Sequence, residues 1–136
     1  MKVRQLLTKK CGRIVSVRME ETVERAAQML WDENIGALVI KDVCNTEGDV
    51  VVGMFSERDF LRAILNHGVS ILQKPVSHLM SPRLISCHSN DEISRAVELF
   101  NKNGIRHLPV IDHNTLVGVI SIRDIVAFYE SAAPNT

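Results

Sequence analysis

Residues 52–61 read Val-Gly-Met-Phe-Ser-Glu-Arg-Asp-Phe-Leu, and residues 117–126 read Val-Gly-Val-Ile-Ser-Ile-Arg-Asp-Ile-Val. The two stretches match at valine, glycine, serine, arginine and aspartate. Upstream of them, a shift of 70 positions places Ile35 on Ile105 and Leu38 on Leu108. A repeated unit of about 60 residues buries its hydrophobic face poorly alone and is stabilised by packing against its copy. We therefore expect two similar halves with a cleft between them.

The composition limits the classes of function. The chain has 136 residues, 46% of them hydrophobic, which suits one compact domain or two small ones and leaves no room for a separate catalytic domain. Sixteen basic residues balance sixteen acidic ones, so we expect neither nucleic acid nor a membrane surface as partner. No apolar run approaches the roughly 20 residues of a membrane helix, and the first residues lack a secretory signal, so we expect a cytoplasmic location.

The spacing of cysteine and histidine argues against a metal site. Cys11, Cys44 and Cys87 form an odd set without a Cys-x-x-Cys pair, which disfavours both a disulfide framework and a zinc knuckle. The five histidines also lack the paired spacing of metal ligands. We predict reduced, structural cysteines and no metal.

Hydrophobic periodicity predicts the same order of elements in each half: a short strand, a helix, two strands and a second helix. Thr22 is the predicted N-cap of the first helix, and Ser89 with Glu92 is predicted to form a capping box for its counterpart. Gly104 is predicted to end that second helix. The polar residues 45–49 lengthen the first hairpin turn relative to the second. The expected boundaries are 8–67 for the first repeat, 68–79 for a linker and 80–136 for the second repeat.

The repeated Ser-x-Arg-Asp lies where a strand ends and a helix begins. A serine N-cap with aspartate three residues later is close to a capping box, which needs no ligand. The arginine in the first turn faces the positive end of the helix dipole, at a cost of about 0.3–1 kcal/mol, and a bound anion would offset that cost. Serine and arginine could donate to a phosphate, whereas the aspartate suits ribose hydroxyls. The nucleotide-binding candidates are Ser56, Arg58, Asp59, Ser121, Arg123 and Asp124.

A second element is Gly-Ile-Arg-His-Leu-Pro-Val at residues 104–110. Pro109 within a strand indicates an edge or a bulge, where unpaired backbone groups could read a base edge, and Arg106 and His107 add donors. The alternative is that His107 is a partly buried histidine with a local partner. The first copy has Gly36 and Ala37 instead, so the two clefts are expected to differ chemically.

Glycines in the strands before both motifs have two possible roles. Gly53 and Gly118 would allow a ligand to approach the backbone closely, and they would equally allow a bulge or tight packing.

The order and duplication of these elements resemble a tandem pair of cystathionine-β-synthase-type (CBS) domains, also called a Bateman module. The resemblance extends from about Thr8 to Tyr129 and includes the lead-in at residues 76–82. It implies an α/β fold of two pseudo-twofold-related β-α-β-β-α repeats packed sheet to sheet. It also implies a regulatory adenosine ligand (AMP, ADP, ATP, S-adenosylmethionine or NAD(H)) and no required cofactor.

The resemblance further implies composite sites, in which the motif aspartate holds the ribose and the motif serine meets phosphate. One cleft would combine Val15, Ile35 and Ala37 with Ser121, Arg123 and Asp124. The other would combine Met80, Ile85, Ile105 and His107 with Ser56, Arg58 and Asp59. Gly36, Arg106 and Pro109 complete the candidate set. The first repeat departs from the family pattern by having Val39 at the position of Pro109.

These features favour a regulatory sensor without enzymatic activity that acts through homodimerisation or through a partner protein of unknown identity. One alternative is a structural dimer or adaptor without ligand. Another is a small nucleotide-processing enzyme that uses Ser56 or Ser121 with His107. The helices after each motif offer the candidate dimer surfaces, with internal packing as the alternative role for Phe60, Leu61, Ile64, Leu65, Ile125, Val126, Phe128 and Tyr129.

Overall fold

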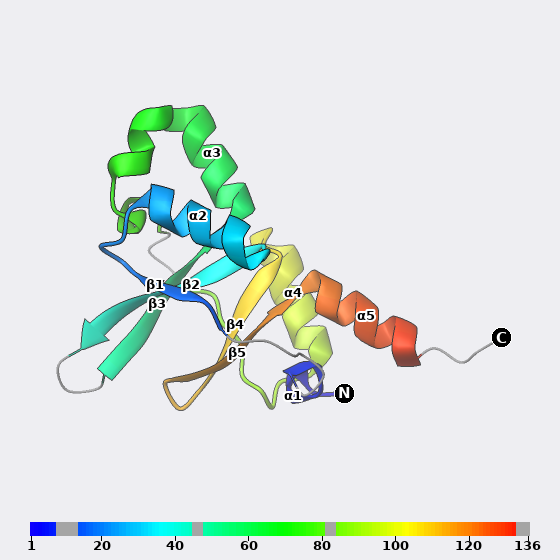
Figure 1. Ribbon diagram of the computed structural model, residues 1–136. Coiled ribbons are helices and arrows are strands. Elements are labelled where there is room, and N and C mark those ends of the chain that lie inside the picture. Colours follow the sequence, from blue (N-terminus) through cyan, green and yellow to red (C-terminus); the bar gives the residue numbers. More distant parts are fainter. Residues whose placement is uncertain (8–13, 45–47, 81–83, 133–136) are drawn as a thin grey trace. The chain divides into compact units, whose positions relative to one another are not determined.

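The computed structural model describes residues 1–7, 14–44, 48–80 and 84–132 (Figure 1). The chain divides into two compact units. The first-repeat unit comprises Ile14–Leu84, and the second-repeat unit comprises Met1–Arg13 together with Ile85–Thr136. Within the described ranges, every helix is too short or too polar to cross a bilayer.

The first-repeat unit has the predicted order of strands and helices. Its three-stranded sheet has the order β1-β2-β3, with β1 parallel to β2 and β2 antiparallel to β3. Helices α2 and α3 lie over one face of this sheet (Figure 1), and they bury Ala26, Leu30 and Ala63 against Leu38, Ile40 and Phe55. The elements are β1 (Ser16–Arg18), α2 (Val23–Glu33), β2 (Ala37–Cys44), β3 (Gly48–Ser56), α3 (Glu57–His67) and the 3-10 helices η1 (Val69–Gln73) and η2 (Val76–Leu79).

The region expected as a linker contributes to packing. Residues 68–79 contain η1 and η2, and the side chains of Ile71 and Val76 are buried in the core of the first-repeat unit. Part of the lengthened hairpin turn, residues 45–47, and the lead-in residues 81–82 lie outside the described residues, as does the expected repeat start at residue 8.

The second-repeat unit contains a two-stranded antiparallel sheet of β4 and β5 with a core of its own. Its elements are α1 (Val3–Leu7), α4 (Ile93–Asn103), β4 (His107–Asp112), β5 (Thr115–Ser121) and α5 (Ile122–Ala132). The short strand predicted at the start of the second half, where residues 85–87 align with residues 15–17 at a shift of 70, is reduced to a single bridge between Cys87 and Val110.

Proline chemistry explains the missing strand. In the first-repeat unit the backbone N–H of Val39 donates to the carbonyl of Val15 at 3.0 Å, which extends the pairing of β1 with β2. Pro109 occupies the equivalent position and has no N–H, so this bond to Ile85 cannot form. The remaining bonds run from the N–H of Cys87 to Pro109 (3.1 Å) and from that of Ile111 to Cys87 (2.8 Å).

The helix ends confirm two of the predicted caps and correct a third. Thr22 accepts a hydrogen bond from the N–H of Arg25, and Gly104 ends α4 in the left-handed conformation with φ 62°. The predicted capping box of Ser89 and Glu92 is wrong, because α4 begins only after Glu92. Ser89 instead donates from its backbone N–H and its hydroxyl to Asp112.

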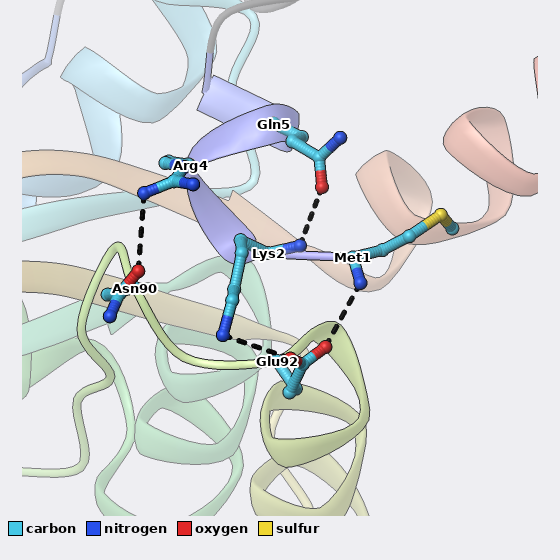
Figure 2. A network of polar contacts seen from close by, with 6 residues as sticks. All are labelled: Met1, Lys2, Arg4, Gln5, Asn90 and Glu92. Atoms are coloured by element: carbon cyan, nitrogen blue, oxygen red, sulfur yellow. Dashed lines mark hydrogen bonds and ion pairs between the residues drawn. The ribbon is translucent and has the colours of Figure 1, made fainter.

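Helix α1 completes the second-repeat unit. Val3 and Leu6 are buried in its core, and the N–H of Val3 donates to the carbonyl of Asp91 at 2.8 Å. The Glu92 carboxylate accepts from Lys2 Nζ and from the Met1 amine, each at 3.0 Å (Figure 2). The segment Val3-x-x-Leu6-Leu7 matches Val76-x-x-Leu79-Met80 before the second repeat. Each lead-in therefore packs with the body of the other repeat.

Candidate functional site

In the first-repeat unit, the Ser-x-Arg-Asp motif joins β3 to α3. Ser56 ends the strand, and its hydroxyl oxygen accepts the N–H of Asp59 at 3.2 Å. In return Oδ2 of Asp59 accepts from the backbone N–H and from the hydroxyl of Ser56, both at 2.9 Å. This is a complete capping box, so the structural role weighed for the motif is confirmed here.

The motif of the second-repeat unit has the same geometry between β5 and α5. The N–H of Ser121 donates to Oδ2 of Asp124 at 2.7 Å, and the N–H of Asp124 donates to the Ser121 hydroxyl at 3.2 Å. A carboxylate has about four acceptor positions, so a capping role does not use up its capacity to bind a hydroxyl group. Capping and ligand binding by this aspartate are therefore compatible.

Both motif arginines lie in the first turn of their helices, and their side chains are exposed. The surrounding charges differ between the two turns. The first turn of α3 carries Glu57 and Asp59, whereas that of α5 carries Asp124 alone, with Ile122 at the position of Glu57.

The start of each strand pair lies beside the motif of the same unit. Ala37 is the register partner of Ser56, and His107 is the partner of Ser121. The first N–H of α3 donates to the carbonyl of Gly36 at 3.0 Å, and the first N–H of α5 donates to the carbonyl of Arg106 at 3.1 Å. We call these the first-repeat corner (residues 36–37 and 56–59) and the second-repeat corner (residues 106–107 and 121–124). The composite sites predicted from the resemblance, which combine strand residues of one repeat with the motif of the other, stay a prediction.

The apolar candidates pack at the edges of the two cores. Val15, Ile35 and Met80 are partly buried against the core of the first-repeat unit, and Ile85 and Ile105 are partly buried against that of the second. These side chains keep some exposed surface, as residues in contact with a ligand require.

The two strand glycines provide space for the lead-in segments. A Cβ on Gly53 would lie 3.4 Å from Cγ of Met80, and a Cβ on Gly118 would lie 2.5 Å from Cδ2 of Leu7. The structure therefore shows the tight packing considered for these glycines, and it also shows the bulge, because each glycine lies where the register of its strand pair shifts. Leu7 is the counterpart of Met80 that the sequence analysis missed, although the Val-x-x-Leu pattern of the two lead-ins could have identified it.

Pro109 lies in an edge strand and directly before a bulge, as the sequence predicted. It is fully buried, and its carbonyl accepts the N–H of Cys87 at 3.1 Å, so its own backbone is paired. A bulge does follow it, between Val110 and Ile111, but the first-repeat unit has the equivalent bulge between Ile40 and Lys41 without a proline. The consequence specific to Pro109 is that the carbonyl of Ile85 receives no hydrogen bond from position 109, whereas the carbonyl of Val15 receives one from the N–H of Val39.

A shallow polar hollow of about 340 Å³ lies elsewhere on the second-repeat unit, lined by His88, Ser89, Asn90, Asp112 and His113. The hydrogen bonds from the side chain and backbone of Ser89 lower the pKa of Asp112. Beneath the surface, burial raises the pKa of the Cys87 thiol to about 12. Among the residues that the structure describes, no three side chains of the metal-binding types gather at one point.

Comparisons with known proteins identify the family. The CBS domain model matches residues 3–66 and 76–131. A mitochondrial CBS domain-containing protein of Arabidopsis thaliana is 35% identical over 109 residues, which cover 79% of this chain and 52% of that protein. The chain thus spans about half the length of this relative.

Two solved structures share the fold. The crystal structure of a CBS-domain protein from Agrobacterium tumefaciens aligns with a TM-score of 0.83 and 34% identity, covering 93% of this chain and 91% of that one. A CBS domain protein from Pyrobaculum aerophilum, solved in complex with AMP, aligns with a TM-score of 0.79 and 25% identity, covering 98% of this chain and 100% of that one. The chain belongs to the CBS domain family and carries two copies of the domain.

Proposed function

We propose that this protein is a regulatory module that binds an adenosine compound at its two Ser-x-Arg-Asp corners. The single observation that carries the proposal is the duplicated corner itself, which places a serine hydroxyl, helix N–H groups, an arginine and an aspartate at the same end of each sheet. The AMP complex of the Pyrobaculum protein supports the choice of ligand class.

Each group at a corner has a distinct role in this proposal. Helix N–H groups, the guanidinium and the serine hydroxyl donate to phosphate, because the positive end of the helix dipole favours an anion there. At Ser56 the hydroxyl would exchange its hydrogen bond to Asp59 for one to the phosphate. The aspartate accepts from ribose hydroxyls. The apolar edge residues contact the adenine, and the Ile85 carbonyl is a candidate acceptor for its amino group. The proposed residues are Val15, Ile35, Gly36, Ala37, Ser56, Arg58, Asp59, Met80, Ile85, Ile105, Arg106, His107, Pro109, Ser121, Arg123 and Asp124.

The proposed output is a change in association, either between two copies of the chain or with a regulated protein in the cytoplasm. The ligand class extends to ADP, ATP and NAD(H), bound as regulatory ligands and not as cofactors. We propose a role without catalysis, since both motif serines take part in helix caps and only the second repeat has a histidine, His107, beside its motif. A nucleophilic serine would need its hydroxyl directed to a base.

Thermal unfolding in the presence of AMP, ATP, NADH and S-adenosylmethionine tests the proposal. A ligand at 100 times its dissociation constant stabilises the folded state by about 2.7 kcal/mol, so at least one of the four should raise Tm by several degrees. Asp124→Ala should remove most of this ligand-induced rise. Because the substitution also removes a capping interaction of α5, the Tm of this variant without ligand should be lower than that of the unaltered protein.

Thr22→Ala is the matched control, because it removes a cap of the same kind from α2. It should lower the baseline Tm and leave the ligand-induced rise intact. If none of the four compounds changes the Tm of the unaltered protein, a structural dimer or adaptor replaces the proposed function.

A further inference from the structure

The two repeats differ by one backbone hydrogen bond beside the residues proposed to contact the base. In the first-repeat unit the carbonyl of Val15 accepts the N–H of Val39 at 3.0 Å, next to the paired strand β1. In the second-repeat unit the equivalent segment is held by the bridge at Cys87. Within the described ranges, no backbone N–H donates to the carbonyl of Ile85. One repeat therefore has an acceptor that the other has already used.

Pro109 is the cause of this difference. It aligns with Val39, but its ring replaces the N–H that would bind Ile85. The proline is fully buried, and its carbonyl accepts the N–H of Cys87 at 3.1 Å, so it is fixed in the strand. The carbonyl of Val15 points at the neighbouring strand, as in any sheet ladder, whereas that of Ile85 needs a partner from outside the ladder.

The open carbonyl belongs to a residue at the edge of the apolar core. Ile85 and Ile105 are both partly buried against the core of the second-repeat unit. We define the second-repeat base position as Ile85, Ile105 and His107, and the first-repeat base position as its counterparts Val15, Ile35 and Ala37. Each set lies within one compact unit. The comparison between them is therefore the same whichever motif completes each cleft.

Purines differ in the group that they offer to such a carbonyl. At position 6 adenine carries an amino group, which donates, whereas guanine and hypoxanthine carry an oxygen, which accepts. An amino group satisfies the Ile85 carbonyl. An oxygen would leave two acceptors facing each other, which is costly beside a partly buried side chain. The carbonyl of Val15 already has its donor and makes no such distinction.

We propose that Pro109 makes the second-repeat base position selective for 6-aminopurines, whereas the first-repeat base position accepts 6-amino and 6-oxo purines alike. Pro109 is a specificity-determining residue that acts through the carbonyl of Ile85. The inference rests on the proposed function, because it assigns a base specificity to each of the sites proposed there.

Three nucleotides with different groups at position 6 are the probes. AMP carries an amino group, inosine 5′-monophosphate (IMP) an oxygen, and purine riboside 5′-monophosphate a hydrogen. The amide NMR signals of residues 15–17 and 85–87 report on the two base positions separately during titration of the full chain. At residues 85–87 AMP should bind about tenfold more tightly than either analogue. At residues 15–17 the three should bind with similar affinity. NADH and its hypoxanthine analogue form a second pair of the same design.

Substitutions of the proline test its role. Pro109→Val supplies the missing N–H, so the preference for AMP at residues 85–87 should fall to that at residues 15–17. The new amide at position 109 should be protected from hydrogen exchange by its bond to Ile85. Pro109→Ala supplies the same N–H with a smaller side chain and should have the same effect on the preference. Val110→Ala is the matched control, because it removes buried atoms from the same strand and keeps the proline. It should lower Tm and retain the preference.

The outcomes separate this inference from the function on which it rests. If none of the four compounds of the thermal assay shifts either set of signals, the proposed function is wrong and the inference falls with it. If amino and oxo compounds bind equally at residues 85–87, or if both proline variants keep the preference for AMP, the inference is wrong while the proposed function stands. A freely exchanging amide at position 109 would also overturn it.

Discussion

At the scale of the residue, the motif serine and aspartate are tied together by reciprocal hydrogen bonds in both units. The sequence pattern predicted both a capping box and a nucleotide contact from the same residues. The structure confirms the capping box. The nucleotide contact stays a proposal, because an aspartate that only caps a helix and one that also binds a ribose have the same sequence pattern. The arginine between them has no role in capping, which is why it carries more of the functional argument.

Glu92 provides a residue-scale prediction about pH. Hydrogen bonds from Lys2 and from the Met1 amine lower the pKa of Glu92. A carboxyl group with a depressed folded-state pKa stabilises the fold above its unfolded-state pKa, and this contribution is lost as the pH falls through the folded-state value. Glu92→Gln should therefore lower the urea midpoint at neutral pH and converge with the unaltered protein in acid.

Glu98→Gln is the control, since Glu98 lies on α4, which begins directly after Glu92, and forms one pair with Arg95 at 3.3 Å. Both carboxylates are exposed, but Glu98 has a single partner three residues away, whereas Glu92 binds two cations of the N-terminal segment, so the control variant should have a smaller effect at neutral pH. Parallel urea curves for Glu92→Gln and the unaltered protein, with the same separation at every pH, would contradict the role given to Glu92.

At the scale of the element, the two lead-ins distinguish sequence repeats from structural units. The family model begins its matches at residues 3 and 76, whereas the compact units change over after Arg13 and Leu84. Helix α1 has five residues, too few to be stable alone, so its helical form depends on packing against the second-repeat unit. The core positions Val3 and Leu6 provide that packing.

Leu6→Ala tests this dependence. Removing a buried leucine side chain costs about 2–5 kcal/mol, and the loss should fall on the second-repeat unit. Hydrogen exchange followed by mass spectrometry should show faster exchange across residues 85–132 and unchanged exchange across 14–44. Leu84→Ala removes the same atoms from an exposed side chain and should have little effect. Equal loss of protection in both units would count against the assignment of α1.

Whether an element could be predicted from the sequence depends on whether the residues that determine it are close together along the chain. Periodicity and caps identified the strand pairs and the helices that follow them, because those signals are local. Two features depend on contacts far along the chain and were missed. The packing of α1 pairs residues 3–7 with residues about 90 positions away, and the lost strand at residues 85–87 depends on the missing N–H of Pro109.

At the scale of the whole molecule, the helices after the motifs divide their apolar residues between two roles. Phe60 and Ile64 pack against one core, and Ile125 and Phe128 are buried in the other, so these four serve internal packing. The side chains of Leu61, Leu65, Val126 and Tyr129 are at least half exposed. Exposed apolar residues grouped on helices mark interaction surfaces, which supports the proposal of a homodimer.

Sedimentation velocity tests the proposed dimer. The unaltered protein should sediment as a dimer, and Leu65→Glu or Val126→Glu should shift it toward the monomer by placing a charge in an apolar contact. Val117→Glu, on an exposed residue of β5, is the control and should leave the dimer intact. A monomer for the unaltered protein at all concentrations would overturn the proposal that output passes through self-association.

The central claim is that the duplicated Ser-x-Arg-Asp corner binds an adenosine compound, and a crystal structure of the full chain grown with AMP tests it most directly. The account predicts phosphate within hydrogen-bonding distance of Ser121, Arg123 and the first N–H groups of α5, with ribose hydroxyls bound to a motif aspartate. A structure with AMP bound away from both corners would contradict it, as would corners left vacant by AMP and by the other three compounds of the thermal assay.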